Sequence, residues 1–296
     1  QRIYKTNINQ MLRYLTLIFY GVFGIGCIYA FLLIFCFSTF KIPSDSMEPQ
    51  LQTGDQVLVN KWIAGPRLFN IFASMKGKRV DIYRVPGVGQ IKRNDILVFN
   101  YPHPYSWERI EMHIMQYYIK RCLGLPGDSI RIEQGFYRNN HTKEPLGNVE
   151  SQANLSRQKA DRMPDGVYRC FPFDSPFNWN VHDFGPLYIP RKGDRITVNQ
   201  TNYKLYKQMI EWESKDSLSW KDSKVYIGDK QVRQYRFQSN YYFVAGDKTE
   251  NSRDSRYLGL IPEEFIVGVA WKVWKSVDPY TGEYRKGRFW KNIRNN

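Results

Sequence analysis

The segment YLTLIFYGVFGIGCIYAFLLIFCF, residues 14–37, is 24 residues long and carries no charged side chain. About 20 apolar residues in a helix are enough to cross the hydrocarbon core of a bilayer. The segment is therefore predicted to span a membrane. A cleavable signal peptide is the alternative, but its apolar region is usually only about 7 to 15 residues long and ends in small residues, which are missing here.

Basic residues on the N-terminal side predict the orientation of this helix. Arg2, Lys5 and Arg13 precede it with no acidic residue among them. The positive-inside rule then places residues 1–13 in the cytoplasm and everything after Phe40 outside. We expect a single pass for the residues present, and a further helix before Gln1 stays open.

A serine pair follows the helix closely. The run IPSDSMEP (42–49) puts Ser44 and Ser46 near the predicted membrane surface. A serine hydroxyl becomes a good nucleophile only when a neighbouring base takes its proton. No histidine lies near these serines in the sequence, so the base is expected to be another residue.

The segment YYIKRCLGLPGD (117–128) offers Lys120 on an apolar strand. A lysine base must be neutral, which requires its pKa to fall by roughly two to three units from about 10.4, and burial can cause this. Alternation along a strand puts Tyr118, Lys120 and Cys122 on one face. Ser46 and Lys120 thus predict a Ser/Lys hydrolase. The alternative is a solvated lysine and a chance serine pattern.

A third segment supports the prediction. GDKTENSRDSRYLGLIP (246–262) carries Ser252, Asp254 and Arg256 in a dense polar turn between two apolar strands. Taken in order, the three segments resemble the motif boxes of type I signal peptidases, membrane-bound serine endopeptidases that remove signal peptides from exported proteins. The resemblance is strong over residues 38–62, 93–102, 117–131 and 242–271.

The resemblance implies a role for each matching residue. Ser46 would be the nucleophile and Lys120 the general base, with the Ser44 hydroxyl and the Ser46 amide binding the oxyanion. Ser252 would orient Lys120, while Asp254 and Arg256 would hold their loop. Residues that match substrate-lining positions are Ile42, Pro43, Met47, Leu51, Tyr118 and Ile119, for which ordinary core packing is the alternative.

The resemblance also implies substrate, partners and location. Signal-peptide-bearing preproteins with small residues before the cut would be the substrates, and the export translocon is a candidate partner. The catalytic domain would lie on the outer face of the bacterial inner membrane. No cofactor is implied. The four histidines show no metal-ligand spacing, so no metal is expected.

Four positions depart from the family pattern. Asp45 stands where Gly is often found, Gln50 replaces Thr, Asn94 replaces Gly, and Lys248 replaces Asn. None of these changes removes a reacting group. Because a negative charge beside an oxyanion site would be unfavourable, we hypothesise that Asp45 faces solvent.

The composition predicts a mainly β protein, because 21 Tyr, 18 Phe and 8 Trp favour strands and membrane interfaces. Strand patterns at 54–62 and 94–102 are expected to be neighbours. We expect further strands at 194–199, 224–229, 241–246 and 264–274, and a short helix at 206–214. The predicted division is a cytoplasmic segment (1–13), a transmembrane helix (14–37), a catalytic core in two parts (38–128 and 241–275), an inserted β-subdomain (129–240) and a basic aromatic tail (276–296).

The formal net charge is +15, yet the basic residues are scattered and no nucleic-acid-binding motif accompanies them. An anionic bilayer is the expected partner, and no nucleic acid is. The tail combines Arg285, Lys286, Arg288, Lys291 and Arg294 with Tyr284, Phe289 and Trp290, which suits an anionic lipid surface; a solvated tail is the alternative.

Two further features stay open. The loop at 63–92, which exposes Leu68, Phe69, Ile71 and Phe72, either dips into the membrane or packs on the domain. Cys122 and Cys170 could form a disulfide.

Two other functions remain possible for the whole chain. Self-cleaving repressors share Ser/Lys chemistry, but they carry a DNA-binding head where this chain has an apolar helix. An inactive, membrane-tethered binding protein is the second alternative, and it predicts no effect of changing Ser46 or Lys120.

Overall fold

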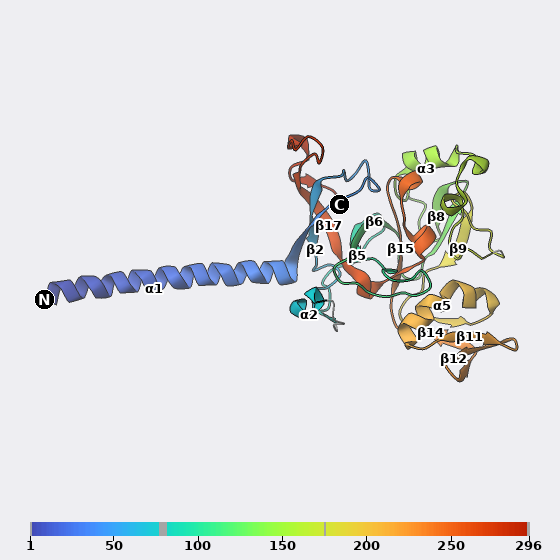
Figure 1. Ribbon diagram of the computed structural model, residues 1–296, viewed down its shortest axis with the longest axis horizontal. Coiled ribbons are helices and arrows are strands. Elements are labelled where there is room, and N and C mark those ends of the chain that lie inside the picture. The colour runs from blue at the N-terminus through green and yellow to red at the C-terminus, as the bar shows by residue number, and fades with distance from the viewer. Residues whose placement is uncertain (1, 77–81, 175, 295–296) are drawn as a thin grey trace.

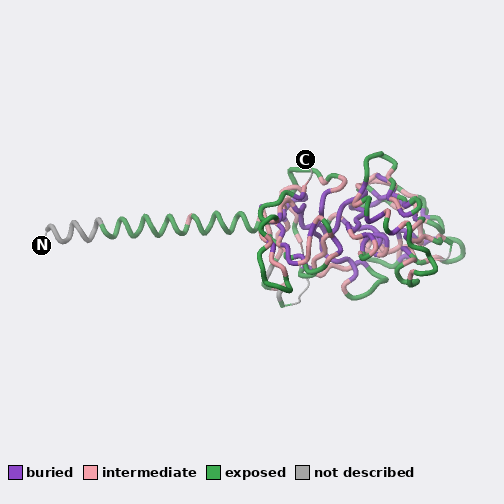
Figure 2. The backbone as a smooth tube through the Cα atoms, turned by 90° about the horizontal axis from the view of Figure 1, so that it is seen from above, coloured by how far each residue is buried: buried purple, intermediate pink, exposed green. Residues whose placement is uncertain are grey.

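A long N-terminal helix projects from a β-rich body in the computed structural model (Figure 1), which describes residues 2–76, 82–174 and 176–294. Helix α1 (Arg2–Phe31) continues into a π-helical turn, η1 (Leu32–Cys36). Met11–Cys36 is long and apolar enough to span a membrane. In Figure 2, residues 11–31 of α1 are coloured as exposed almost throughout, so the body does not cover this part of the helix, and only the end of η1 at Cys36 is buried. Length, composition and exposure fit a membrane anchor better than a core helix.

The body is built on one antiparallel sheet. Its strand order is β1 (Phe37–Lys41), β2 (Asp55–Asn60), β17 (Ile266–Ser276), β5 (Ile96–Asn100), β6 (Tyr117–Gly124), β15 (Tyr241–Ala245) and β16 (Ile261–Pro262), with β18 (Lys291–Asn292) paired to β17.

The strands predicted at 54–62 and 94–102 are present but are not neighbours, which corrects that expectation. β17, from near the C-terminus, pairs with β2 on one edge and with β5 on the other. Burial explains the local patterns: β2 alternates between buried and half-buried residues, whereas every residue of β5 is buried. Local alternation identifies a strand but carries no information about a partner more than 160 residues away.

Residues 129–240 form an excursion between two neighbouring strands, since β6 pairs directly with β15. The excursion contains a sheet of β8 (Phe136–Asn139), β7 (Ser129–Glu133) and β9 (Phe184–Tyr188), a ribbon of β10 (Arg195–Thr197) with β14 (Gln234–Arg236), and a sheet of β11 (Leu218–Lys221), β12 (Lys224–Ile227) and β13 (Lys230–Val232). Its helices are α3 (Val149–Ser156), α4 (Asp165–Tyr168), α5 (Gln200–Ser214) and the 3₁₀ turn η2 (Ala160–Arg162).

Helix α5 is longer than predicted and begins at residue 200. The Asn199 side chain caps it by accepting a hydrogen bond from the Asn202 amide, and the left-handed Lys215 ends it. Its buried residues Leu205 and Met209 face the body. The predicted strands at 194–199 and 224–229 are confirmed in shorter form as β10 and β12.

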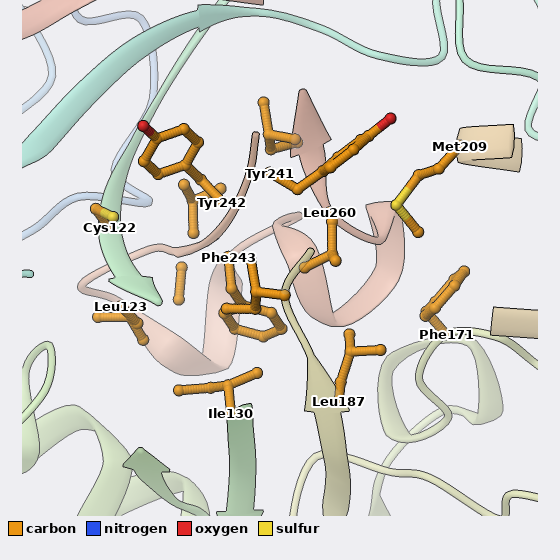
Figure 3. Packing of buried hydrophobic residues seen from close by; sticks show 14 of the residues in the cluster. Cys122, Leu123, Ile130, Phe171, Leu187, Met209, Tyr241, Tyr242, Phe243 and Leu260 are labelled. Carbon is orange, nitrogen blue, oxygen red and sulfur yellow. The ribbon is translucent and has the colours of Figure 1, made fainter. Parts of the chain in front are cut away.

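The excursion shares a hydrophobic core with the main sheet. Figure 3 shows Phe243 of β15 close to Ile130 of β7 and Leu187 of β9, and Tyr241 of the same strand belongs to the same cluster. The same cluster includes Met209 of α5. Because burial of this surface requires both parts, the main sheet and the excursion stabilise each other. The fold is mainly β, as predicted.

Short elements complete the chain. They are α2 (Ile71–Met75), β3 (Arg67–Leu68), β4 (Tyr83–Arg84), η3 (Thr249–Asn251), α6 (Ser255–Leu258), η4 (Glu263–Phe265) and η5 (Lys286–Arg288).

The described part of loop 63–92 packs on the body at its base but leaves Phe72 exposed. Arg84 donates to the carbonyls of Ala64, Gly65 and Ile266, which packs the base of the loop on the body. Phe72, however, is highly exposed. Residues 77–81 lie outside the described residues, and insertion into a membrane stays a prediction.

Candidate active site

Ser46 lies in the turn between β1 and β2, and both ends of that turn are anchored. Ile42 exchanges backbone hydrogen bonds with Gly54 and Asp55, at 2.9 and 2.8 Å. Met47 is fully buried in the second apolar cluster of the body. The Lys248 amide donates to the Ser46 carbonyl oxygen at 3.1 Å. These contacts fix the backbone that carries the hydroxyl.

Lys120 lies on β6 and is only 4% exposed. Its Nζ is 2.7 Å from Ser46 Oγ and 2.9 Å from the Ile119 carbonyl oxygen. The Tyr118 ring centroid is 5.6 Å from the same nitrogen. The fold therefore brings together two residues that are 74 positions apart in the sequence.

Burial determines the charge state of this lysine. Desolvation lowers the pKa of Lys120 to about 8, and Arg256 acts in the same direction, whereas Asp254, Asp247 and Asp45 raise it. The desolvation outweighs three carboxylates because Nζ is almost excluded from water. A substantial neutral fraction is then available at mildly alkaline pH, as a lysine base requires.

The loop beneath the dyad is held by a buried ion pair. Asp254 is 0% exposed, and both of its oxygens accept from the Arg256 guanidinium at 2.9 Å. Although burial raises the pKa of Asp254, the Arg256 charge and the Gly246 amide bring it below the usual value. Arg256 also donates to the Thr249 carbonyl at 2.8 Å. The pair thus ties the two ends of the loop together.

A second buried pair joins this loop to the lysine strand. Arg121, next to Lys120, forms a two-pronged ion pair with Asp247 at 2.5 to 2.6 Å. The sequence analysis did not predict this pair, although Arg121 directly follows Lys120 and Asp247 directly follows Gly246.

The sequence analysis also did not predict that position 246 must be a glycine. A Cβ added there would lie 2.2 Å from Ser252 Oγ and 2.6 Å from the Ser46 carbonyl oxygen. Only glycine fits between the nucleophile turn and Ser252 without displacing one of them.

Two predicted supporting serines lie at the site with different geometry. Ser44 is exposed, with Oγ 3.4 Å from Ser46 Oγ. Ser252 Oγ is buried and has no hydrogen-bond partner within the described residues, so the expected bond to Lys120 is not formed here. Lys120 Nζ is instead engaged by Ser46 and the Ile119 carbonyl.

The predicted substrate-lining residues divide into two groups. Pro43 is exposed, and Tyr118 and Ile119 are half-buried, so these residues present surface beside the dyad. Ile42, Met47 and Leu51 are at most 2% exposed and belong to the apolar cluster beneath it. For this second group, the structure shows the packing that was the alternative.

Asp45 does not simply face solvent, which corrects our hypothesis. Its carboxylate forms an ion pair with Lys248 and accepts hydrogen bonds from Asn251 Nδ2 at 3.1 and 3.2 Å. The Lys248 hydrogen bond, opposed by partial burial, lowers the pKa of Asp45. The charge next to the nucleophile is therefore paired.

The basic tail is neither fully solvated nor fully available to lipid. Arg288 binds the fully buried Asp55 with both prongs and donates to the Gln50 carbonyl at 2.9 Å. Arg294 pairs with the buried Asp95, and Arg285 pairs with Asp278. Arg288 and Arg294 fasten the tail to the body, and Arg288 does so at the base of the nucleophile turn. The Arg285–Asp278 pair lies within the tail, and Arg285 reaches the body through the Thr53 carbonyl, to which it donates at 2.9 Å. Binding of lipid by the exposed aromatic residues stays a prediction.

Cys122 and Cys170 are buried and unpaired, so the disulfide that the sequence left open is not formed. Burial raises the pKa of the Cys170 thiol to about 12 and raises that of Cys122 further.

A cavity of about 790 Å³ lies beside the dyad, between α5 and the loop at 250–260. Ser252 lines it, but neither Ser46 nor Lys120 does. The reacting atoms of the dyad therefore lie outside this cavity.

Comparison with known proteins shows which family this chain belongs to. The family model described as signal peptidase, peptidase S26, matches residues 14–175 and 185–274. Signal peptidase I of Buchnera aphidicola (subsp. Acyrthosiphon pisum) is 29% identical over 263 residues, which cover 86% of this chain and 73% of the relative. Signal peptidase I of Pseudomonas aeruginosa is 29% identical over 252 residues, which cover 82% and 66%.

A crystal structure of a signal peptidase I from Enterococcus faecalis matches 62% of this chain and 98% of its own length, at 16% identity and a TM-score of 0.30. The family match covers most of the chain and includes both Ser46 and Lys120. The chain therefore belongs to the signal peptidase family, peptidase S26, and is a serine peptidase.

Proposed function

We propose that this protein removes N-terminal signal peptides from exported preproteins, using Ser46 as nucleophile and Lys120 as general base. The observation that carries the proposal is the 2.7 Å contact between Lys120 Nζ and Ser46 Oγ at a lysine whose pKa is lowered to about 8. A base must lie within hydrogen-bond reach of the proton it takes and must have a pKa near the working pH.

The reaction begins with neutral Lys120. Its lone pair accepts the Ser46 proton as Oγ attacks the scissile carbonyl carbon, which gives a tetrahedral intermediate. The resulting ammonium returns the proton to the leaving amine, and an ester forms between the signal peptide and Ser46. Neutral Lys120 then takes a proton from water as the water oxygen attacks the ester carbonyl. The bond to Ser46 Oγ breaks, and the ammonium returns the proton to that oxygen, which restores the Ser46 hydroxyl and neutral Lys120.

Ser44 and the Ser46 amide are the proposed oxyanion donors. The Ser44 hydroxyl lies 3.4 Å from Ser46 Oγ and is exposed, so it can turn toward a substrate oxygen. The Ser46 amide forms no hydrogen bond with other described backbone groups. One oxyanion donor is typically worth about 3 to 4 kcal/mol in the transition state.

The free strand edges beside the dyad suit an extended peptide. β1 pairs only with β2, and β15 pairs with β6 from Arg121 onward, which leaves Tyr117–Ile119 unpaired on that edge. Phe40 of β1 contacts Tyr117 of β6, with ring centroids 4.9 Å apart, so the two edges approach each other. An added peptide strand would gain main-chain hydrogen bonds there. Pro43, Tyr118 and Ile119 would contact such a peptide, because they present surface beside the dyad, whereas Ile42, Met47 and Leu51 are buried beneath it.

The proposed anchor helix would hold the site near the membrane. Ser46 follows only ten residues after Cys36, the last residue of η1, and a chain of that length spans at most roughly 35 Å. We propose that α1 crosses the bacterial inner membrane once, with the body on the outer face. A signal peptide held in the same bilayer would then present its cleavage site at this height. Anionic lipid and the translocon are the proposed partners.

The test is cleavage of a purified preprotein by the detergent-solubilised full chain, with the new N-terminus read by mass spectrometry. We expect a cut after a small-x-small sequence, and none with folded Ser46→Ala or Lys120→Ala. A folded wild-type chain that cuts none of several preproteins at mildly alkaline pH would reject the proposal and favour a membrane-tethered binding protein.

A further inference from the structure

Two charged residues on either side of Ser46 contact each other. Asp45 lies in the nucleophile turn, and Lys248 lies in the loop at 246–256. Their side chains form an ion pair, 35% and 32% exposed. Asn251 donates to both oxygens of the same carboxylate, and Glu48 lies 3.9 Å from Lys248 Nζ.

The attachment has a backbone component as well. The Lys248 amide donates to the carbonyl oxygen of Ser46, while its ammonium binds the residue just before Ser46. Lys248 therefore holds the turn at two successive residues. Its own carbonyl accepts from the Asn251 amide at 3.0 Å, which keeps the two partners of Asp45 in one rigid unit.

This part of the turn has little other support. Ile42 and Met47 are buried on either side, and Ser46 is buried as well, but Pro43 and Ser44 are exposed. Within the turn, the Glu48 amide donates to the Asp45 carbonyl at 2.9 Å. The core thus fixes the two ends of the turn, and its middle depends on polar contacts. Because a misplacement of about 1 Å at a reacting atom can cost about 100-fold in rate, such contacts affect catalysis.

We propose that Asp45 and Lys248, with Asn251, form a charge-compensated clamp that positions the Ser46 turn and offsets the effect of the Asp45 carboxylate on Lys120. The proposal rests on the proposed function for its kinetic consequences. Asp45 and Lys248 are positioning residues, since neither contacts the reacting atoms.

The charges around Lys120 affect its protonation, so changing the clamp should change the pH at which Lys120 becomes neutral. Asp254 and Asp247 favour its ammonium form, Arg256 disfavours it, and the Asp45 carboxylate favours it from the nucleophile turn. Removing Asp45 alone should therefore ease deprotonation of Lys120, and the Lys248 charge, then left with Glu48 as its ion-pair partner, acts in the same direction. Removing Lys248 alone leaves the Asp45 charge uncompensated and should hinder deprotonation.

The experiment measures the pH dependence of kcat/KM for the full-length wild type, Asp45→Asn, Lys248→Met and the double variant. We expect the acid limb to move to lower pH in Asp45→Asn and to higher pH in Lys248→Met, by a few tenths of a pH unit each. In the double variant the limb should return close to the wild-type position, while the plateau stays reduced because the turn is less well held.

A matched control comes from another ion pair. Asp174 and Lys204 have similar exposure, 32% and 25%, and lie apart from the dyad. Asp174→Asn should leave the acid limb where it is. A purely structural effect of the clamp changes would lower the plateau and leave the limb unmoved.

Thermal unfolding of the same four proteins tests the clamp independently of activity. The two single changes should lower the unfolding temperature by amounts that sum to more than the effect of the double change, because each single variant loses the same interaction. The clamp is refuted if the unfolding effects simply add, or if both single variants shift the limb in the same direction or not at all. A wild type that cleaves nothing rejects the proposed function, and the unfolding cycle then decides the clamp alone.

Discussion

Replacing Gly246 with Ala tests how closely the nucleophile turn fits its support. The added Cβ would lie 2.6 Å from the Ser46 carbonyl oxygen and 2.6 Å from Ser252 Cβ, whereas ordinary contact begins near 3.4 Å. The Ser252 hydroxyl can rotate away, but the other two atoms move only with the backbone. The turn and the loop must therefore separate by about 0.8 Å.

That displacement acts directly on the dyad, because the Ser46 carbonyl and its hydroxyl belong to one residue. A shift approaching 1 Å at a reacting atom costs about 100-fold in rate, so kcat should fall by roughly that factor with little change in KM. The assay is steady-state cleavage of a purified preprotein by wild type, Gly246→Ala and Gly166→Ala. An alanine at Gly166 meets no atom within 4 Å and should leave the rate unchanged. A folded Gly246→Ala enzyme within threefold of wild type would refute the reasoning.

Three further changes test the supporting residues. Asp254→Asn leaves Arg256 buried without its carboxylate and should lower the free energy of unfolding by about 3 to 5 kcal/mol, measured by urea denaturation. Because the pKa of Asp254 is lowered in the folded state, its stabilising contribution is present at neutral pH and is lost as the pH falls through the folded-state value. Arg288→Gln leaves the buried Asp55 without its ion-pair partner and should lower the free energy of unfolding by several kcal/mol, measured in the same way. Ser252→Ala removes a buried hydroxyl that makes no well-formed hydrogen bond and contributes only a minor interaction to Asp254, so stability should change little while kcat falls.

Controls separate these effects from general damage. Asp174→Asn at a partly exposed pair and Lys286→Gln on an exposed side chain should each change the unfolding free energy by less than about 1 kcal/mol. If Asp254→Asn or Arg288→Gln is no more destabilising than these controls, the buried pairs do not hold the site as described. A Ser252→Ala enzyme with wild-type kcat would remove that residue from the mechanism.

The sequence was most informative where the type of a residue alone restricts the surroundings that it can have. The uncharged run at 14–37 requires an apolar environment, and Lys120 within an apolar strand requires burial that lowers its pKa. Both features can be recognised without knowing the rest of the fold. The same applies to Asn199, whose capping of α5 could have been read from its position.

The features that were missed depend on contacts between distant segments. β17 separates β2 from β5, and the Asp45–Lys248 and Arg288–Asp55 pairs join residues that are more than 200 positions apart. No local pattern specifies which basic residue meets which carboxylate. The tail arginines were therefore interpreted by composition, which favours lipid or solvent, although buried carboxylates in the body bind two of them, Arg288 and Arg294.

The pH dependence of kcat/KM tests the central claim most directly, since it reports the charge state of the base in the free enzyme. Cleavage would be measured from roughly pH 6 to pH 10 with wild type and Lys120→Ala. A base with a pKa of about 8 predicts an acid limb centred near that value, with activity falling about tenfold per pH unit below it, and no activity in Lys120→Ala at any pH. An acid limb near pH 6 to 7, the range of a histidine, or a Lys120→Ala enzyme that still cleaves, would contradict the account.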